Sequence, residues 1–287
     1  GWLTPERQLA IAVLAGAGLI AAGLWLARYD RLYAAYLPAA GVVVLYLATY
    51  GAHLYYQLIG AQFALGAVAA ISMAAIALGA HFRRSAYAAL AAVCVYLTPL
   101  VMETVRATLL ELALYFTAWS LVFCYCALHE KRRMTYLVPL YLAFLCFDAA
   151  WRLADTGEWQ YAAFYQFAQF LIFAATAAWY SLRHAAPLNT EESFAHALPL
   201  LYFYVSEYLL IGAQAPALAP VLALASAGLL LVLYLATRRR LTAGLDDDPP
   251  SAVLVSGYCS LVTTHVVFFE YLPFRYLPWA AIALTPV

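Results

Sequence analysis

The sequence predicts an all-α protein, a polytopic transmembrane helical bundle of about ten spans with both chain ends on the external side. Three observations support this prediction: 67% of the 287 residues are hydrophobic, only 10% are charged, and apolar runs continue unbroken for about 20 residues. Soluble domains contain roughly 45–50% apolar and about 25% charged residues, so the composition excludes an ordinary soluble fold. The unbroken runs also exclude the short alternating strands of a porin-type β-barrel.

Ten runs are long enough to cross the membrane, because about 30 Å of hydrocarbon requires roughly 20 apolar residues in a helix. The run from 85 to 129 is interrupted only by Glu103 to Arg106, after Pro99. We divide it there, since one helix of that length is too long to cross once. Short connections predict a single transmembrane domain over 1–287. The predicted spans are 8–27, 32–56, 61–82, 85–103, 108–129, 134–154, 161–182, 195–212, 217–237 and 251–272.

The positions of the basic residues predict the orientation. Fifteen Lys and Arg balance fifteen Asp and Glu, so the net charge gives no electrostatic reason to expect a nucleic-acid partner. If every run crosses the membrane, 11 of the 15 basic residues fall on one side. Under the positive-inside rule that side is cytoplasmic, which places both ends of the chain outside. The eleven are Arg28, Arg31, Arg83, Arg84, Lys131, Arg132, Arg133, Arg183, Arg238, Arg239 and Arg240.

The ends of the sequence predict that it is part of a longer polypeptide. Gly1 to Pro5 contains no initiating Met, basic n-region or cleavable apolar region, so it is not a signal peptide. An external start then requires an earlier helix or a removed leader. At the other end, the apolar residues from Pro278 to Val287 predict the beginning of an eleventh span.

Three short patches carry a resemblance to a known family. They are the Gly-Trp-Leu-Thr-Pro-Glu opening, the segment Tyr-Leu-Ala-Thr-Tyr-Gly-Ala-His-Leu-Tyr-Tyr at 46–56, and Tyr-Leu-Thr-Pro-Leu at 96–100. With the later aromatic spans separated by Arg clusters, they resemble the bacterial multi-pass family called domain of unknown function 2339. The resemblance implies an envelope-related protein of the bacterial inner membrane. It supplies no known activity and no catalytic residues.

Ionisable residues inside spans are costly and usually face the bundle interior, so each is a candidate for a functional site. Under the predicted orientation most of them lie in the outer half of the membrane. Several share a helix face with tyrosines, and a carboxylate or imidazole beside aromatic hydroxyls suits an amphiphilic or polyhydroxylated headgroup. We therefore predict an outward-facing polar vestibule. Its candidate residues are Asp148, Arg152, Glu207, Tyr208, Tyr204, His265, Glu270 and His53.

A purely structural interpretation of the same residues stays open. Charged side chains near helix ends reach back to the interface, and tyrosines form belts at both surfaces. This interpretation applies to Arg152 and Glu270, which lie close to the ends of their spans. Asp148 and Arg152, at i and i+4, are also suited to an ion pair that stabilises the bundle. His265 is suited to a hydrogen bond between helices.

The sequence predicts neither a metal site nor a bound cofactor other than lipid. His53 lies near the outer end of its span, four histidines lie near the inner surface and only His265 is central, and no Cys/His ligand spacing occurs. The four are His81, His129, His184 and His196. All five cysteines fall inside apolar spans, where they behave as small hydrophobic residues. No nucleophile elbow, P-loop or dinucleotide fingerprint is present.

Two functional hypotheses follow. The first is a structural or accessory subunit of a larger assembly in the bacterial inner membrane, without catalysis of its own. Its partners are membrane lipids and other membrane-protein subunits. The alternative is an envelope lipid- or glycan-handling transporter or transferase that uses the polar vestibule.

Overall fold

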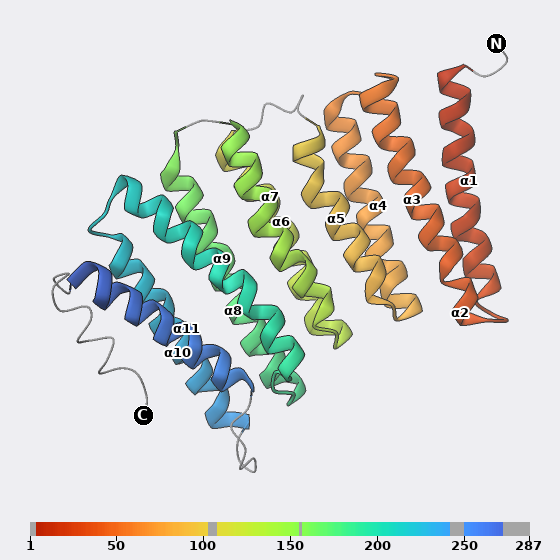
Figure 1. Cartoon of the computed structure of the whole chain (residues 1–287). Helices are drawn as coiled ribbons and strands as arrows, with labels where there is room; N and C mark the ends of the chain where they lie inside the picture. Colours follow the sequence, from red (N-terminus) through yellow and green to blue (C-terminus); the bar gives the residue numbers. More distant parts are fainter. Residues whose placement is uncertain (1–3, 103–107, 155–156, 242–249, 272–287) are drawn as a thin grey trace. The chain divides into compact units, whose positions relative to one another are not determined.

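The computed structural model describes residues 4–102, 108–154, 157–241 and 250–271, and over these ranges the chain consists of helices joined by short connections (Figure 1). This confirms the all-helical prediction. The helices are α1 (Pro5–Leu26), α2 (Arg31–Ala34), α3 (Tyr36–Tyr50), α4 (Ala61–Phe82), α5 (Ser85–Val101), α6 (Leu109–Glu130), α7 (Met134–Ala154), α8 (Trp159–His184), α9 (Thr190–Gln214), α10 (Ala219–Leu241) and α11 (Pro250–Val266). Two π-helical segments, η1 (Gly51–Tyr55) and η2 (Val267–Tyr271), continue α3 and α11.

Each predicted span corresponds to one helix or to one continuous helical segment. Within the described residues, eight segments are long and apolar enough to cross a membrane, and the shorter α5 is also apolar. The predicted break between α5 and α6 is confirmed. Pro99 lies in the last turn of α5, and Thr108 starts α6 by accepting a hydrogen bond of 3.3 Å from the Glu111 backbone. Glu103 and Arg106 lie outside the described residues.

Two helices, α9 and α10, extend four or more residues beyond a predicted limit, and each difference has a local cause. α9 starts at Thr190, five residues before the predicted 195, because Asn189 and Glu192 form a capping box. α10 continues past the predicted 237 through Arg238, Arg239 and Arg240. Basic side chains are favourable there, since the carboxyl end of a helix carries partial negative charge.

The chain forms two compact units, residues 1–156 and 157–287, and each is described by itself. In unit 1 successive spans run in opposite directions, so the connections that carry Arg28, Arg83 and Arg132 lie at one end (Figure 1). In unit 2 the last turns of α8 and α10, which carry Arg183 and Arg238, likewise lie at one end (Figure 1). The helix directions within each unit thus agree with the alternation of charge in the sequence.

α1 and α3 of unit 1 approach each other closely through glycines. A Cβ atom added at Gly41 would lie 2.5 Å from the carbonyl oxygen of Gly16, and one at Gly23 would lie 2.3 Å from Cδ of Pro38. In a membrane, helices gain little from the hydrophobic effect, and small residues stabilise them by allowing close backbone contact. These glycines are therefore required for the packing of α1 on α3.

Tyrosine hydroxyls connect α3, α4, α5 and α6 of unit 1. The apolar bodies of these side chains pack in the core, while their hydroxyls bond to hydroxyls on neighbouring helices. Tyr46 and Tyr50, which the sequence places on a stripe with His53, both have such a role. The bonds are Tyr46–Ser72 at 2.6 Å (α3 to α4), Tyr50–Thr98 at 2.9 Å (α3 to α5) and Tyr96–Ser120 at 2.7 Å (α5 to α6).

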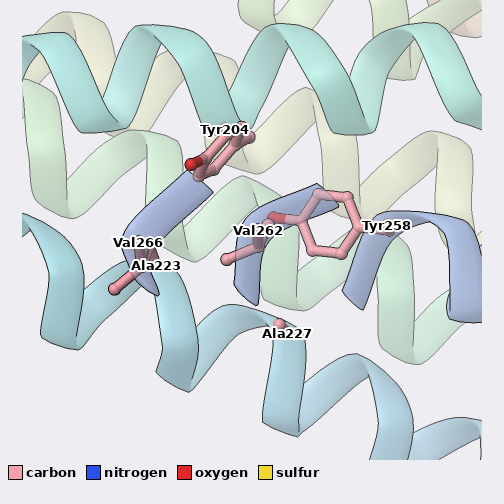
Figure 2. Close-up of a cluster of buried hydrophobic side chains, with 6 residues drawn as sticks. All are labelled: Tyr204, Ala223, Ala227, Tyr258, Val262 and Val266. Carbon is pink, nitrogen blue, oxygen red and sulfur yellow. The ribbon is translucent and has the colours of Figure 1, made fainter. Parts of the chain in front are cut away.

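Unit 2 consists of α8 to α11 and is centred on a small core shared by α9, α10 and α11. Figure 2 shows the buried side chains of this core, Tyr204, Ala223, Ala227, Tyr258, Val262 and Val266. Ala223 and Ala227, two short residues of α10, belong to this core, and α9 and α11 contact each other as well as α10. α9 and α11 run parallel. Tyr204 of α9 contacts Tyr258 of α11, and farther along the same direction Tyr208 of α9 bonds Glu270 of η2, which continues α11.

The glycine contact between α1 and α3 gives a first prediction. Gly41→Ala places a methyl group against the Gly16 carbonyl, so we expect it to lower the free energy of unfolding by about 1–3 kcal/mol, as overpacking does in cores. Gly18→Ala is the matched control, because no atom lies within 4 Å of its added Cβ. The melting temperature of each variant in detergent measures its stability. Equal stability of the two variants would contradict the proposed contact.

Candidate functional site: a polar cluster between α9 and α11

Four of the eight predicted vestibule residues form one cluster in unit 2, in which ring contacts join two hydrogen-bonded pairs, and Glu207 lies beside them. Tyr204, Glu207 and Tyr208 lie on one face of α9, at i, i+3 and i+4. His265 ends the regular part of α11, and Glu270 lies in η2. Five residues turn an α-helix by about 500°, which would leave these two side chains about 140° apart. The wider π-helical turn brings residues i and i+5 toward the same face, so both can reach α9.

Two hydrogen bonds join the helices in this polar cluster. The Tyr204 hydroxyl lies 2.6 Å from Nδ1 of His265, and the Tyr208 hydroxyl donates to the Glu270 carboxylate. The rings of Tyr208 and His265 meet edge to face, with their centroids 4.9 Å apart and their planes at 78°. Glu270 is exposed, whereas Tyr204 is buried. The polar cluster thus extends from the core of unit 2 to its surface.

Glu207 lies beside this polar cluster but outside its hydrogen bonds. Only 6% of the residue is exposed, and its Oε2 atom has no hydrogen-bond partner among the described residues. A cavity of about 10 Å³ adjoins it, close to the volume that one water molecule requires. The cavity is lined by Phe203, Tyr204, Glu207, Tyr208, Ile211, Ala219, Leu222, Ala223 and Ser226.

Tyr258 and Ser226 also belong to the site, although neither is among the residues predicted from the sequence. The Tyr258 hydroxyl lies 3.0 Å from Oγ of Ser226, and its ring meets that of Tyr204 edge to face at 6.2 Å (Figure 2). Tyr258 precedes His265 by seven residues, which is a same-face spacing in a helix. That spacing could have identified it. Nothing in the sequence indicates Ser226, because its position depends on how α10 packs.

The three remaining candidates lie in unit 1. Nε of Arg152 is 2.8 Å from Oδ2 of Asp148, which forms the predicted i, i+4 ion pair. Asp148 is buried, while the Arg152 side chain is 66% exposed, as in a side chain that extends toward an interface. Nδ1 of His53 lies 3.0 Å from the carbonyl oxygen of Ile59. This hydrogen bond joins η1 to the connection that follows it.

A second feature of unit 2 is an apolar groove of about 530 Å³ between the first halves of α9 and α11. One polar atom, Oγ of Ser193, is buried in this region without a hydrogen-bond partner among the described residues. The sequence gives no sign of the groove, because it depends on how far apart the two helices lie. Its lining consists of Thr190, Ser193, Phe194, Ala197, Leu200 and Leu201 from α9, and Pro250, Val253, Leu254, Gly257, Tyr258 and Leu261 from α11.

Neither feature has the ligand set of a metal centre. Across the described ranges, no group of three or more His, Cys, Asp or Glu side chains lies close enough together to hold a metal ion. The polar cluster offers a carboxylate, an imidazole and phenol hydroxyls, which can bind polar groups and pass protons.

Comparison with known proteins gives one match. A family model described as "Predicted membrane protein (DUF2339)" matches residues 1–281. Neither a curated protein nor a solved structure matches the chain.

The bond between Tyr204 and His265 gives a second prediction. Tyr204→Phe removes the hydroxyl and leaves the imidazole without this partner, so we expect a loss of about 0.6–1.7 kcal/mol in the free energy of unfolding, as for other hydrogen bonds between membrane helices. Tyr271→Phe serves as the control, because that side chain is exposed and the structure records no hydrogen bond for it within the described residues. Detergent unfolding of both variants tests this, and an unchanged Tyr204→Phe protein would show that the bond is unimportant.

Proposed function

The chain belongs to the family of predicted membrane proteins called DUF2339, as the sequence resemblance predicted, and on this premise we propose that it binds a lipid of the bacterial inner membrane. The proposal rests on one observation, the apolar groove of about 530 Å³ between α9 and α11. Of the two functions that the sequence leaves open, the groove favours lipid handling in the envelope. The occupant is the hydrocarbon chain of an anionic phospholipid.

The length of the groove supports this occupant. Its lining runs from Thr190 to Leu201 on α9 and from Pro250 to Leu261 on α11. At 1.5 Å per residue each stretch is roughly 17 Å long, about half of the 30 Å hydrocarbon core of a bilayer. The groove therefore fits an acyl chain from one leaflet. Its volume also lies within the range of about 300–1,000 Å³ that is common for ligand pockets.

Charge supports an anionic headgroup. The groove begins at the first residues of α9 and α11. Figure 1 shows these helix starts at the same end of unit 2 as the last turn of α10, which carries Arg238, Arg239 and Arg240. Basic residues at that membrane surface attract anionic lipids, at about 1 kcal/mol for each Lys or Arg. Glu192 lies at the same end, but its side chain accepts a bond from the Asn189 backbone in the capping box.

The polar cluster lies at the opposite end of the groove. Tyr204 follows Leu201 on α9, and His265 follows Leu261 on α11, so both lie about one turn beyond the groove lining. The hydrocarbon chain therefore ends near the Tyr204–His265 bond. In this arrangement the headgroup binds at the arginines, and the polar cluster limits how deeply the chain enters.

Filling the groove gives a third prediction. Gly257 lines the groove and has open space around an added Cβ, so Gly257→Leu fills the groove without displacing backbone. We expect it to reduce lipid capture by roughly tenfold, equivalent to about 1.4 kcal/mol. The protein is placed in phosphatidylethanolamine vesicles that contain a trace of phosphatidylglycerol with a photoactivatable acyl chain. Mass spectrometry of the α9 and α11 peptides then measures the crosslink.

Gly228→Leu on α10 is the matched control, because it makes the same substitution at an open glycine outside the groove. Capture should remain at the wild-type level in this variant. Equal capture by the two leucine variants would contradict the lipid-binding proposal, and capture confined to α10 would place the lipid elsewhere.

A second function, the accessory-subunit role, is favoured by the surface of α1. Only Gly16 and Gly23 of this helix are buried, and Ile11, Leu14 and Trp25 are 57%, 72% and 59% exposed. An apolar helix that packs through one narrow glycine face leaves its remaining surface available to another membrane protein. The two functions are compatible, because the groove lies in unit 2 and α1 in unit 1.

Site-specific crosslinking from α1 gives a fourth prediction. A photoreactive benzoylphenylalanine at Leu14 should yield a discrete crosslinked protein band in native membranes, and the same residue at Val232 of α10, which is 62% exposed, should not. Purification in mild detergent should then recover the same partner. A lone monomer, with crosslinks only to lipid, would argue against the subunit role.

A further inference from the structure

Glu207 is an acidic side chain enclosed in the interior of unit 2. The residue is 6% exposed, its Oε2 atom has no hydrogen-bond partner, and no ion pair is recorded for it among the described residues. An ionised carboxylate without a partner is very costly in an apolar environment, and the group avoids that cost by holding a proton. Intramembrane acids with this character mark proton pathways.

The register of α8 against α9 places a second acceptor level with Glu207. The rings of Phe170 and Phe203 stack with centroids 4.6 Å apart, and Ala163 lies in one core cluster with Ile211. Along these antiparallel helices Gln166 therefore lies opposite Glu207. Gln166 is 2% exposed, and its Oε1 atom also has no hydrogen-bond partner within the described part of the chain.

Oε2 of Glu207 and Oε1 of Gln166 are thus two buried oxygens at the same depth in unit 2, and neither has a donor among the described residues. A proton on Glu207 supplies one. Buried polar atoms are almost always hydrogen-bonded, so two such atoms at one level require an explanation. The cavity of about 10 Å³ beside Glu207 has room for one water molecule, with the Tyr208 and Ser226 side chains on its wall. We propose that Glu207 is an intramembrane proton-binding site that exchanges its proton with the surface of unit 2 through the polar cluster.

The neighbouring groups permit this exchange. On α9 the titratable neighbours are Tyr204 and Tyr208, and on α11 they are Tyr258 and His265. α10 contributes the Ser226 hydroxyl, and on α8 the buried Tyr165 directly precedes Gln166. The positively charged residue of α8, Arg183, lies in the last turn with His184, far along the helix from Gln166.

The proposed route has two steps. Glu207 gives its proton to a water molecule in the cavity, and Tyr208 accepts one proton from that water while it donates its own to the exposed carboxylate of Glu270. One proton moves from Glu207 to Glu270. Glu207 becomes a carboxylate, Glu270 becomes an acid, and the water and Tyr208 end unchanged.

Carbodiimide labelling tests the proton site and gives a fifth prediction. Dicyclohexylcarbodiimide enters membranes and adds to protonated carboxyl groups, so wild-type protein in phospholipid vesicles should carry an adduct on the Glu207 peptide at neutral pH. Labelling should fall as the pH rises and Glu207 ionises. Glu207→Gln should lose the adduct on this peptide, and Glu270→Gln should keep it, because Glu270 is exposed and lies at the end of the route.

Stability and infrared measurements separate this site from a structural role. Glu207→Gln should melt close to the wild type, since a neutral amide replaces a neutral acid. Gln166→Leu should shift the carbonyl stretch of the Glu207 acid, because the acid loses its acceptor. Tyr208→Phe should slow exchange of its proton for deuterium.

Three results would overturn the proposal. They are a wild-type protein that carries no adduct on Glu207 at neutral pH, an adduct that sodium ions block, and a Glu207→Gln protein that melts far below the wild type. A missing adduct or a large loss of melting temperature would mean that the Glu207 carboxylate is ionised and paired. A block by sodium ions would mean that a metal cation occupies the site. An unchanged infrared band in Gln166→Leu, or unchanged exchange in Tyr208→Phe, would remove that residue from the site.

Discussion

The interior of a bilayer offers no water to hydrogen-bond with protein groups, and much of this structure follows from that constraint. Backbone groups are satisfied within helices, and polar side chains have to find partners on neighbouring helices. Tyr46, Tyr50 and Tyr96 of unit 1 do this through hydroxyl bonds to serine and threonine. In unit 2 Tyr204 and Tyr258 do the same with His265 and Ser226. The abundance of tyrosine in the sequence, 23 residues, thus has a structural use.

The same constraint makes the exceptions informative. Among the described residues, the buried oxygens Oε2 of Glu207 and Oε1 of Gln166 have no hydrogen-bond partner, and Oγ of Ser193 is another such atom beside the apolar groove. Most buried polar groups in proteins are hydrogen-bonded, so unpartnered atoms mark places where a proton, a water molecule or a ligand completes the bonding. Unit 2 contains all three of these residues, along with the groove and the polar cluster. The proposed lipid-binding groove and the proposed proton site therefore both lie in this unit.

The sequence predicted the helices well because their signals are local. Long apolar runs, a proline near the end of α5 and basic residues between spans all act over a few residues, and they gave ten segments that the structure reproduces. Helix ends were less accurate where a cap or a dipole interaction extends the helix, as at Asn189 and Arg240. The i, i+4 pair of Asp148 and Arg152 was predictable for the same reason, since both partners belong to one turn of one helix.

By itself the sequence determined the membrane environment, the helical fold, the positions of the spans and the inventory of polar residues within them, because hydropathy and helical spacing are properties of the chain alone. Only the tertiary structure decided which of these residues meet. It brought Tyr204 to His265 and Tyr208 to Glu270, and it placed His53 against a local carbonyl group instead. Contacts between helices depend on rotation, register and separation, and these are set by packing at residues such as Gly41 and Ala223 that carry no chemical signal of their own.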